Sequence, residues 1–230
     1  DWFGTGKRSE AEPLLAGLRE TFELQGTDCF QYGTFMHLQR TRVRSPLGTF
    51  IRPHEKYLDK VVDILGLKGA NACATPHLAV ERPAVDPPLE ADAIFKYRSA
   101  SMCLNYLGAD RLDAMRDIRE LTQHMVAPTE HDMRCLKHVT RYLMGTPDHG
   151  VWLPWPDANG KPVGTDTQSG QPDEVRGQPG EVRLETSVDS DWAADKNSRK
   201  SVVCFDIRAD DCSLHASVRQ QSFVALSSGE

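Results

Sequence analysis

Two carboxylates, Asp189 and Asp191, stand two positions apart at the end of an alternating apolar and polar run. Because successive side chains of a strand point to opposite faces, both acids are expected on the face opposite the apolar one. Two acids on one face repel each other unless a cation lies beside them. Such a pair therefore suits a divalent metal ion and metal-assisted phosphodiester hydrolysis. The alternative is a solvated strand end that performs no chemistry.

The elements that position these acids are expected to form a short antiparallel meander. The first strand ends at the two acids, and a charged turn with Lys196, Arg199 and Lys200 comes after it. Two further apolar runs, at 202–207 and 223–226, are separated by a polar break. Short apolar runs between polar breaks are typical of antiparallel strands.

A run of arginines, Arg40, Arg42 and Arg44, forms a second candidate site. The sequence predicts a hairpin with strands near 34–42 and 49–52 around a Ser-Pro-Leu-Gly turn. The spacing of two puts the three guanidinium groups on one face of the first strand. Guanidinium groups in a row suit the phosphates of a polyanion, and the simpler alternative is a solvated strand face.

Helical patterns account for much of the rest of the chain. The first begins with an S-x-x-E capping box at Ser9 and Glu12, and the last has Thr129 as its cap with Asp132 at the capping-box position. The four later helices are expected at 55–65, 93–107, 112–125 and 129–144.

Histidine and cysteine side chains share one face of the last expected helix. His131, Cys135 and His138 have the spacing i, i+4, i+7 and could contribute to a metal site. A structural zinc site needs four ligands, and no C-x-x-C or H-x-x-x-H pair is nearby, so a half-buried helix face is favoured. The sequence also contains no G-x-S-x-G, Walker or G-x-G-x-x-G motif, which leaves hydrolase, NTPase and dinucleotide functions unsupported.

The composition of the chain narrows the classes of protein to which it can belong. The chain has 230 residues, a net charge of -6 and six cysteines without a C-x-x-C pair. Its mean hydropathy is -0.48, and no apolar run approaches the roughly 20 residues of a membrane span. With no secretory leader in view, the expectation is an intracellular protein with reduced thiols and no membrane partner. The negative charge means that any nucleic-acid binding would depend on local basic patches.

Several stretches together resemble the Pol polyproteins of copia-type retrotransposons. SVDSDWAADKNSRKS and the later RQQSFVALSSGE are similar to that family's RNase H domain, and HEKYLDKVVDILGL with CATP is similar to the end of its reverse transcriptase domain. FKYRSASMCLNYL and PTEHDMRCLKHVTRYLMGTPDHGVWL resemble the segment between them, and the initial DWFGTG resembles the residues just after the polymerase Tyr-x-Asp-Asp box. The resemblance covers nearly the whole chain in the family's order.

The resemblance implies an α+β fold in four parts. The end of a reverse transcriptase palm and thumb is expected at 1–82 and a helical connection segment at 93–150, with a Pro-rich and acidic stretch between them. A flexible linker is expected at 151–181, and a truncated RNase H-like antiparallel meander at 182–230.

The resemblance also implies the chemistry. The ancestral function is RNA-directed DNA synthesis with RNase H cleavage of RNA in RNA:DNA hybrids. Asp189 matches a catalytic aspartate that binds Mg²⁺ or Mn²⁺, Asp191 belongs to the motif without being the usual ligand, and Asp1 matches the second Asp of the polymerase box. Both sites are expected to be incomplete, so that this chain alone holds no metal ion and has neither activity.

The implied partners are an RNA:DNA hybrid or template-primer and the other parts of the Pol polyprotein, in a cytoplasmic particle or the nucleus. Leu112, Cys204 and His215 depart from the family pattern, as in a decayed copy of the element. Two alternatives therefore stay open: a non-catalytic nucleic-acid-binding or connection module, and an inert remnant.

Overall fold

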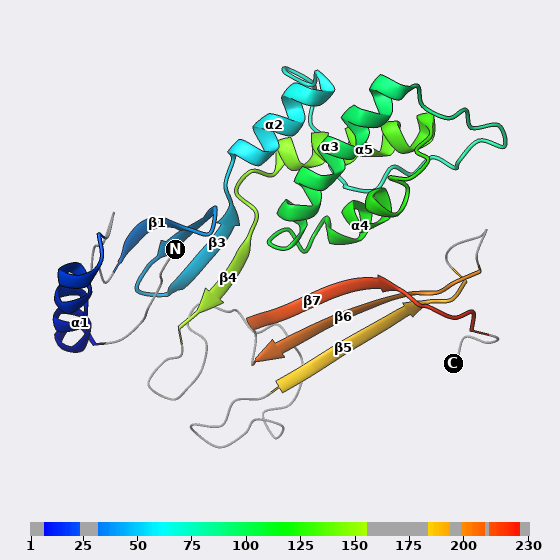
Figure 1. Ribbon diagram of the computed structural model, residues 1–230. Helices are drawn as coiled ribbons and strands as arrows, with labels where there is room; N and C mark the ends of the chain where they lie inside the picture. The colour runs from blue at the N-terminus through cyan, green and yellow to red at the C-terminus, as the bar shows by residue number, and fades with distance from the viewer. Residues whose placement is uncertain (1–6, 24–31, 156–183, 194–198, 210–211, 226–230) are drawn as a thin grey trace.

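The computed structural model describes residues 7–23, 32–155, 184–193, 199–209 and 212–225. These residues form two antiparallel sheets and a layer of helices (Figure 1), which agrees with the expected α+β class. No helix in these ranges has the length and apolar character needed to cross a membrane. The elements are α1 (Arg8–Thr21), β1 (Gly33–His37), β2 (Arg40–Arg44), β3 (Gly48–Pro53), α2 (Lys56–Leu65), α3 (Ala91–Gly108), α4 (Met115–Gln123), α5 (Glu130–Gly145), β4 (Val151–Pro154), β5 (Leu184–Asp191), β6 (Val202–Ala209) and β7 (Cys212–Gln220).

The first sheet has the strand order β1-β2-β3-β4, all antiparallel. The continuous strand expected near 34–42 is wrong, because a tight turn at Leu38 and Gln39 divides it into β1 and β2. Both turn residues have positive φ, 51° and 60°, as a two-residue hairpin turn of type I′ requires. Neither residue type favours that conformation, so the sequence carried no turn signal there.

The second turn of this sheet was predicted correctly. The amide of Ser45 donates to the carbonyl of Gly48 at 2.8 Å, closing the Ser-Pro-Leu-Gly turn between β2 and β3. The short strand β4 then returns from far along the chain and pairs with β3, so that Gly48 lies opposite Pro154. A Cβ at Gly48 would come within 2.5 Å of the carbonyl oxygen of Leu153, which explains the need for glycine at this contact.

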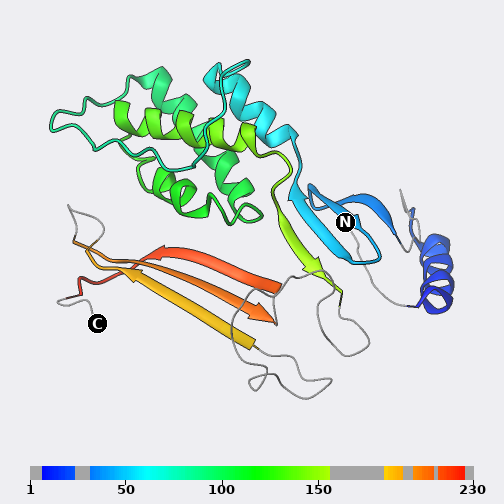
Figure 2. The ribbon, with the colours of Figure 1, turned by 180° about the vertical axis from the view of Figure 1, so that it is seen from behind.

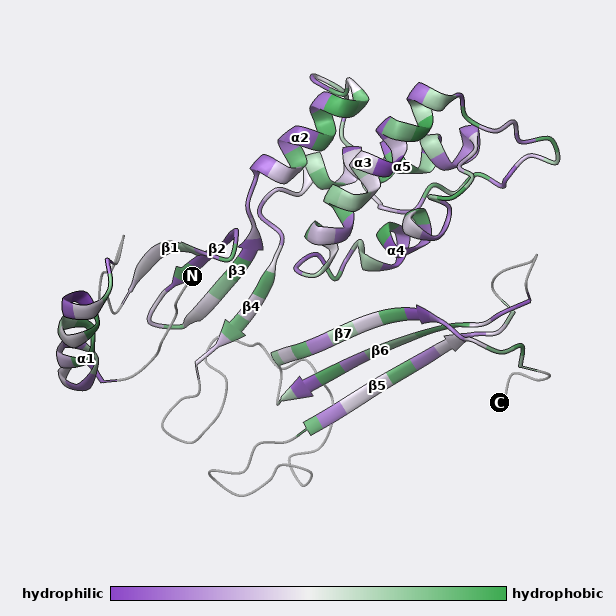
Figure 3. Ribbon diagram, viewed as in Figure 1, coloured by the Kyte–Doolittle hydropathy of each residue, from purple (hydrophilic) through white to green (hydrophobic). Residues whose placement is uncertain are grey.

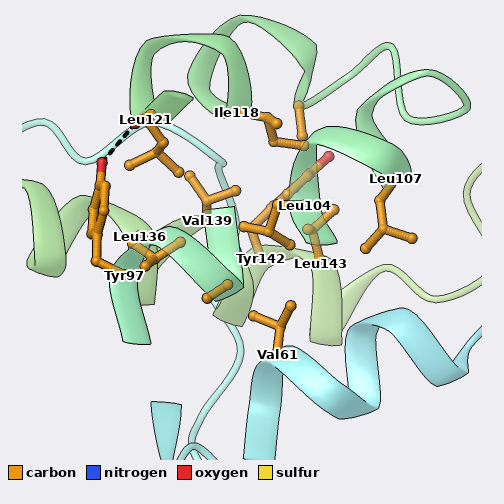
Figure 4. Packing of buried hydrophobic residues seen from close by; sticks show 12 residues of the cluster. Val61, Tyr97, Leu104, Leu107, Ile118, Leu121, Leu136, Val139, Tyr142 and Leu143 are labelled. Carbon is orange, nitrogen blue, oxygen red and sulfur yellow. Dashed lines mark hydrogen bonds between the residues drawn. The ribbon is translucent and has the colours of Figure 1, made fainter. Parts of the chain in front are cut away.

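Helices α2 to α5 enclose the largest hydrophobic core of the described residues (Figure 4). Tyr97 of α3 is fully buried, and its hydroxyl donates to the carbonyl of Leu121 in α4 at 2.8 Å. Val61 of α2 packs into the same cluster. The core residues are Val61, Tyr97, Ala100, Leu104, Leu107, Ala114, Ile118, Leu121, Leu136, Val139, Tyr142 and Leu143.

The glycine at the end of α2 and the capping box at the start of α5 are as predicted. Gly66 ends α2 with a φ of 65°, the left-handed conformation typical of a glycine at a helix end. The capping box of α5 is formed: the side chain of Thr129 accepts from the amide of Asp132, and the carboxylate of Asp132 accepts from the amide of Thr129 at 2.8 Å. Both signals are local in sequence, which is why they could be recognised.

The starts of α1 and α4 differ from prediction. The N-cap of α1 is Lys7, without a side-chain cap, so the capping box expected at Ser9 is wrong and Ser9 lies inside the helix. Helix α4 begins at Met115 instead of 112, because Arg111 forms two hydrogen bonds with Asp113, of 3.0 and 2.7 Å, in the turn before it.

The Pro-rich stretch before α3 is non-helical, as expected, but it is anchored to α5. Asp86 accepts from the amide of His131 at 3.1 Å and from Arg82 at 2.6 Å. The amide of Glu130 donates to the carbonyl of Pro87 at 3.0 Å. The predicted division of the chain into four parts stays a prediction.

The second sheet is the expected meander, with the order β5-β6-β7 and antiparallel pairing throughout. The third strand, however, was predicted at 223–226, and the structure has it at Cys212–Gln220. That stretch alternates Cys212, Leu214, Ala216 and Val218 with polar residues, a period-two signal that the single His and Arg among them obscured. Figure 2 shows from behind that β7 is the strand of this sheet nearest the helices, and it contacts α4.

The edge strand β5 is more exposed than predicted. Its apolar residues Leu184 and Val188 have 69% and 65% of their surface exposed, so the expected half-buried face is wrong. Figure 3 shows the alternation of hydrophobic and hydrophilic residues along β5 that suggested burial. The alternation identified a strand correctly, but no layer of the described residues covers that face.

Candidate nucleic-acid and metal site

Asp189 and Asp191 lie in the last part of β5. Asp189 pairs with Cys204 of β6, and Asp191 pairs with Val202. Both side chains are at the surface, and Asp191 forms an ion pair with Arg116 of α4, 3.3 Å between Nη2 and Oδ2. Asp191 is therefore engaged by Arg116. Asp189 forms no ion pair among the described residues.

A network of hydrogen bonds fixes the chain just after these acids. The indole nitrogen Nε1 of Trp192 donates to the carbonyl of Ala225 at 3.2 Å, and the amide of Ala193 donates to Oγ of Ser201 at 3.2 Å. Ser201 is buried, and its carbonyl accepts from the amide of Gln221 at 2.8 Å. The Asp-x-Asp-Trp-Ala segment and the residues after β7 are thereby held together at one end of the meander.

The basic residues predicted beside the acids are placed only in part. Arg199 lies with its guanidinium carbon 5.7 Å from the ring centroid of Trp192 and has a φ of 59°. Lys200 is half-buried next to it. Lys196 lies outside the described residues, as does Asp1, so their predicted roles stay predictions.

The described residues do not fit a divalent metal site by themselves. They contain no group of three His, Cys, Asp or Glu side chains placed to hold an ion. A two-ion centre needs more carboxylates than Asp189 and its neighbour.

The predicted His and Cys face of α5 is also no metal site among the described residues. Burial lowers the pKa of His131 and raises the pKa of Cys135 to about 11. His138 instead contacts Cys73 and Thr75. The favoured interpretation, a half-buried helix face, agrees with these contacts.

The three arginines do share strand β2, where all are half-buried. Arg40 forms an ion pair with Asp110, 2.5 Å between Nε and Oδ2, and its guanidinium carbon lies 5.7 Å from the ring centroid of Tyr106. The guanidinium carbon of Arg44 lies 4.9 Å from the ring centroid of Trp155. Arg40 is thus engaged by Asp110 and Tyr106 within the fold. In contrast, no carboxylate among the described residues pairs with Arg44.

A groove that the sequence did not predict lies between the helices, the first sheet and β7. Its volume is about 800 Å³, and its polar lining includes Asp110, Arg119 and Arg219. Apolar lining comes from Leu112, which precedes α4, from Leu153 of β4, and from other residues of α4 and β7. Such a groove depends on elements distant in sequence, so no local pattern could have revealed it.

Comparison with curated proteins finds relatives among transposon proteins. The chain is 29% identical over 139 residues to the retrovirus-related Pol polyprotein from transposon RE2 of Arabidopsis thaliana, covering 60% of this chain. It is 30% identical over 135 residues to the corresponding polyprotein from transposon RE1 of the same plant, covering 59%. The chain is similar to retrotransposon Pol polyproteins. The resemblance predicted from the motifs is thus confirmed.

The chain spans only a small part of the Pol polyproteins that it matches. The alignments span 9% and 8% of the length of the RE2 and RE1 polyproteins. An uncharacterized mitochondrial protein of Arabidopsis thaliana is 25% identical over 218 residues, which is 94% of this chain and 78% of that protein. No family model matches the chain, and no solved structure matches it.

Proposed function

We propose that the chain is a segment of a copia-type retrotransposon Pol polyprotein. It contains the end of the reverse transcriptase region, a helical connection segment and the first strands of an RNase H-like domain. The parent protein performs RNA-directed DNA synthesis and removes RNA from the resulting hybrid. The observation that carries this proposal is the similarity to two transposon Pol polyproteins over about 60% of the chain.

The second sheet supports the RNase H-like part of the proposal. Asp189 lies near the end of the first of three antiparallel strands, on an exposed edge that a nucleic-acid duplex can reach. The bond from Trp192 to Ala225 brings the two separate motif segments together. The arrangement gives the Asp-Trp-Ala motif a structural purpose: it fixes the strand end on which Asp189 stands.

The helical core supports the connecting part. Val61 of α2, from the expected end of the reverse transcriptase region, packs in one core with α3 to α5. Strand β4 continues from α5 into the first sheet, and α4 contacts β7 of the second. A helical layer that contacts both sheets is suited to hold the reverse transcriptase region and the RNase H-like domain in a fixed relative position.

In the parent, a bound Mg²⁺ or Mn²⁺ would supply Lewis-acid chemistry for phosphodiester hydrolysis at a site held by several carboxylates. We propose Asp189 as one carboxylate of that site, and we propose that this chain alone has neither polymerase nor RNase H activity. Incubation of the purified chain with a labelled RNA:DNA hybrid and Mg²⁺ tests this, with intact RNA as the expected result. Magnesium-dependent cleavage that Asp189→Asn abolishes would overturn the proposed inactivity.

The second candidate is a non-catalytic nucleic-acid-binding module. It is favoured by Arg44, whose guanidinium lies over Trp155 and pairs with no carboxylate among the described residues. If Arg44 contacts a phosphate, Arg44→Gln weakens binding of an RNA:DNA hybrid and reduces the slope of log K against log salt by about 1. Lys68→Gln is the matched control, because Lys68 pairs with Asp63 on α2. Absent or salt-independent binding would leave the inert remnant.

A further inference from the structure

Cys73 and His138 are in contact although they lie far apart in the sequence. Sγ of Cys73 is 3.6 Å from Nδ1 of His138, across 65 residues of chain. The other ring nitrogen, Nε2, is 3.0 Å from the carbonyl oxygen of Thr75. Both ring nitrogens of one imidazole are therefore engaged.

The partner of Nε2 determines where the proton of the neutral ring lies. A carbonyl oxygen only accepts hydrogen bonds, so Nε2 must carry the hydrogen that points at Thr75. Nδ1 then presents a lone pair toward the thiol, and the S–H of Cys73 donates to it. This is the arrangement of a nucleophile, a base and a group that orients the base.

The loop that carries Cys73 is held firmly against α5. The amide of Cys73 donates to the carbonyl of Arg141 at 3.4 Å, and Nε of Arg141 donates to the carbonyl of Asn71 at 2.5 Å. A Cβ at Gly145 would lie 2.7 Å from the Cβ of Ala72, so the helix end and the loop approach closely. The thiol and the imidazole consequently face each other across a fixed contact.

We propose that Cys73 and His138 form a reactive thiol site whose substrates are small disulfides. This inference is independent of the proposed Pol function. His138 takes the proton of the thiol at Nδ1, and the Cys73 sulfur attacks one sulfur of the disulfide. A new S–S bond forms as the old one breaks, and the leaving sulfur departs with the electron pair and accepts the proton from His138. Cys73 is oxidised to a mixed disulfide and half of the small disulfide is reduced to a thiol.

Other thiols of the chain provide internal comparisons. Cys135 lies on the same helix as His138, but burial raises its pKa to about 11, which opposes thiolate formation. Cys103 is half-buried like Cys73 and has no histidine contact among the described residues. If exposure alone determined reactivity, Cys73 and Cys103 would react at similar rates. The imidazole of His138 is expected to make Cys73 the more reactive thiol.

The test is the rate at which each cysteine of the folded chain forms a mixed disulfide with glutathione disulfide, measured by peptide mass spectrometry. We expect Cys73 to react about tenfold faster than Cys103 and faster still than Cys135, and His138→Asn to remove most of this advantage. His77→Asn is the matched control, because His77 lies on the same loop and bonds Asp117 at 2.9 Å. Equal rates at Cys73 and Cys103 in the folded chain would overturn the proposal.

A second measurement keeps the proposal testable if His138→Asn does not fold. The ¹⁵N chemical shifts of the His138 ring in the unmodified chain report which nitrogen carries the proton. We expect the Nε2–H form, with Nδ1 accepting. A ring protonated at Nδ1 and bare at Nε2 would contradict the proposed proton transfer.

Discussion

The indole nitrogen of Trp192 donates a hydrogen bond to the backbone oxygen of Ala225, across 33 residues of chain. The bond joins the segment after β5 to the segment after β7, so this one end of the meander depends on it. Ala225 itself is buried, which places this contact in a protected environment. Loss of the bond should therefore affect the strand end on which Asp189 stands.

Trp192→Phe tests this contact because it retains an aromatic ring and removes the donor. We expect a loss of about 0.5–1.5 kcal/mol in the free energy of unfolding. Amide exchange at Ala193 and Gln221, both bonded to Ser201, should become faster. Trp152→Phe, on the first sheet, is the control, and equal exchange changes in both variants would argue against a local role for Trp192.

The ion pair of Arg40 and Asp110 should stabilise the contact between the first sheet and α3. Their side chains are 25% and 10% exposed, so solvent screens the pair only in part. A double-mutant cycle with Arg40→Gln and Asp110→Asn should give a coupling energy of about 1–3 kcal/mol. The exposed pair Arg8 and Glu12, 70% and 55% exposed, should give about 0–0.5 kcal/mol in the same experiment.

The side chain of Asp132 should contribute more to the free energy of unfolding than the side chain of Thr129, which caps the same helix. The Asp132 side chain is 3% exposed and accepts from Arg82, from His124 at 2.8 Å and from the amide of Thr129. Burial opposes ionisation, but the hydrogen bonds from His124 and Thr129 hold the pKa of Asp132 below its ordinary value. Asp132→Ala should lower the free energy of unfolding by about 2–4 kcal/mol in urea titrations. Thr129→Ala should cost only about 1 kcal/mol.

Asp113 should make stability depend on pH in the acid range. Burial alone would raise the pKa of Asp113, but hydrogen bonds from Arg111 and Tyr142 outweigh it and lower the pKa to about 2. A carboxyl with a depressed folded-state pKa stabilises the fold above its unfolded pKa and loses that effect as the pH falls through the folded value. Asp113→Asn should therefore cost about 1–2 kcal/mol near pH 7, and the deficit should shrink from about pH 4 toward pH 2.

Urea titrations at several pH values measure this difference. Asp148→Asn is the control, since that side chain is 89% exposed and should change stability little at any pH. A deficit of Asp113→Asn that stays constant down to pH 2 would show that the charge of Asp113 is not what stabilises the turn before α4.

Some local signals of this fold were predictable, although the capping box expected at Ser9 is not formed. The capping box at Thr129 and the left-handed Gly66 depend on neighbouring residues, and both were recognised. The turn at Leu38 and Gln39 was missed because tertiary pairing of β1 and β2 imposes a backbone that these residues do not favour. The exposed face of β5 was misjudged because burial depends on what packs against a strand, which alternation alone does not specify.

The candidate site also has a part that could be predicted from the sequence and a part that could not. Asp189 could be singled out from its spacing to Asp191 and from the family motif. The engagement of Arg40 by Asp110 and of Asp191 by Arg116 could not, because each pair spans about 70 or more residues. Such pairs depend on how the layers meet, and they decide which charges stay available for a ligand.

Asp189 is proposed to stand on the surface that meets an RNA:DNA hybrid. The most direct test is the affinity of the purified chain for a labelled hybrid at low salt, compared between Asp189→Asn and Glu185→Gln. Both changes remove one negative charge from the same face of β5, but Glu185 lies near the start of the strand, and only Asp189, near its end, is proposed to lie beside the phosphates. We predict that Asp189→Asn tightens binding about fivefold while Glu185→Gln has little effect. No binding of the hybrid, or an equal change in the two variants, would contradict the proposed position of Asp189 beside the hybrid.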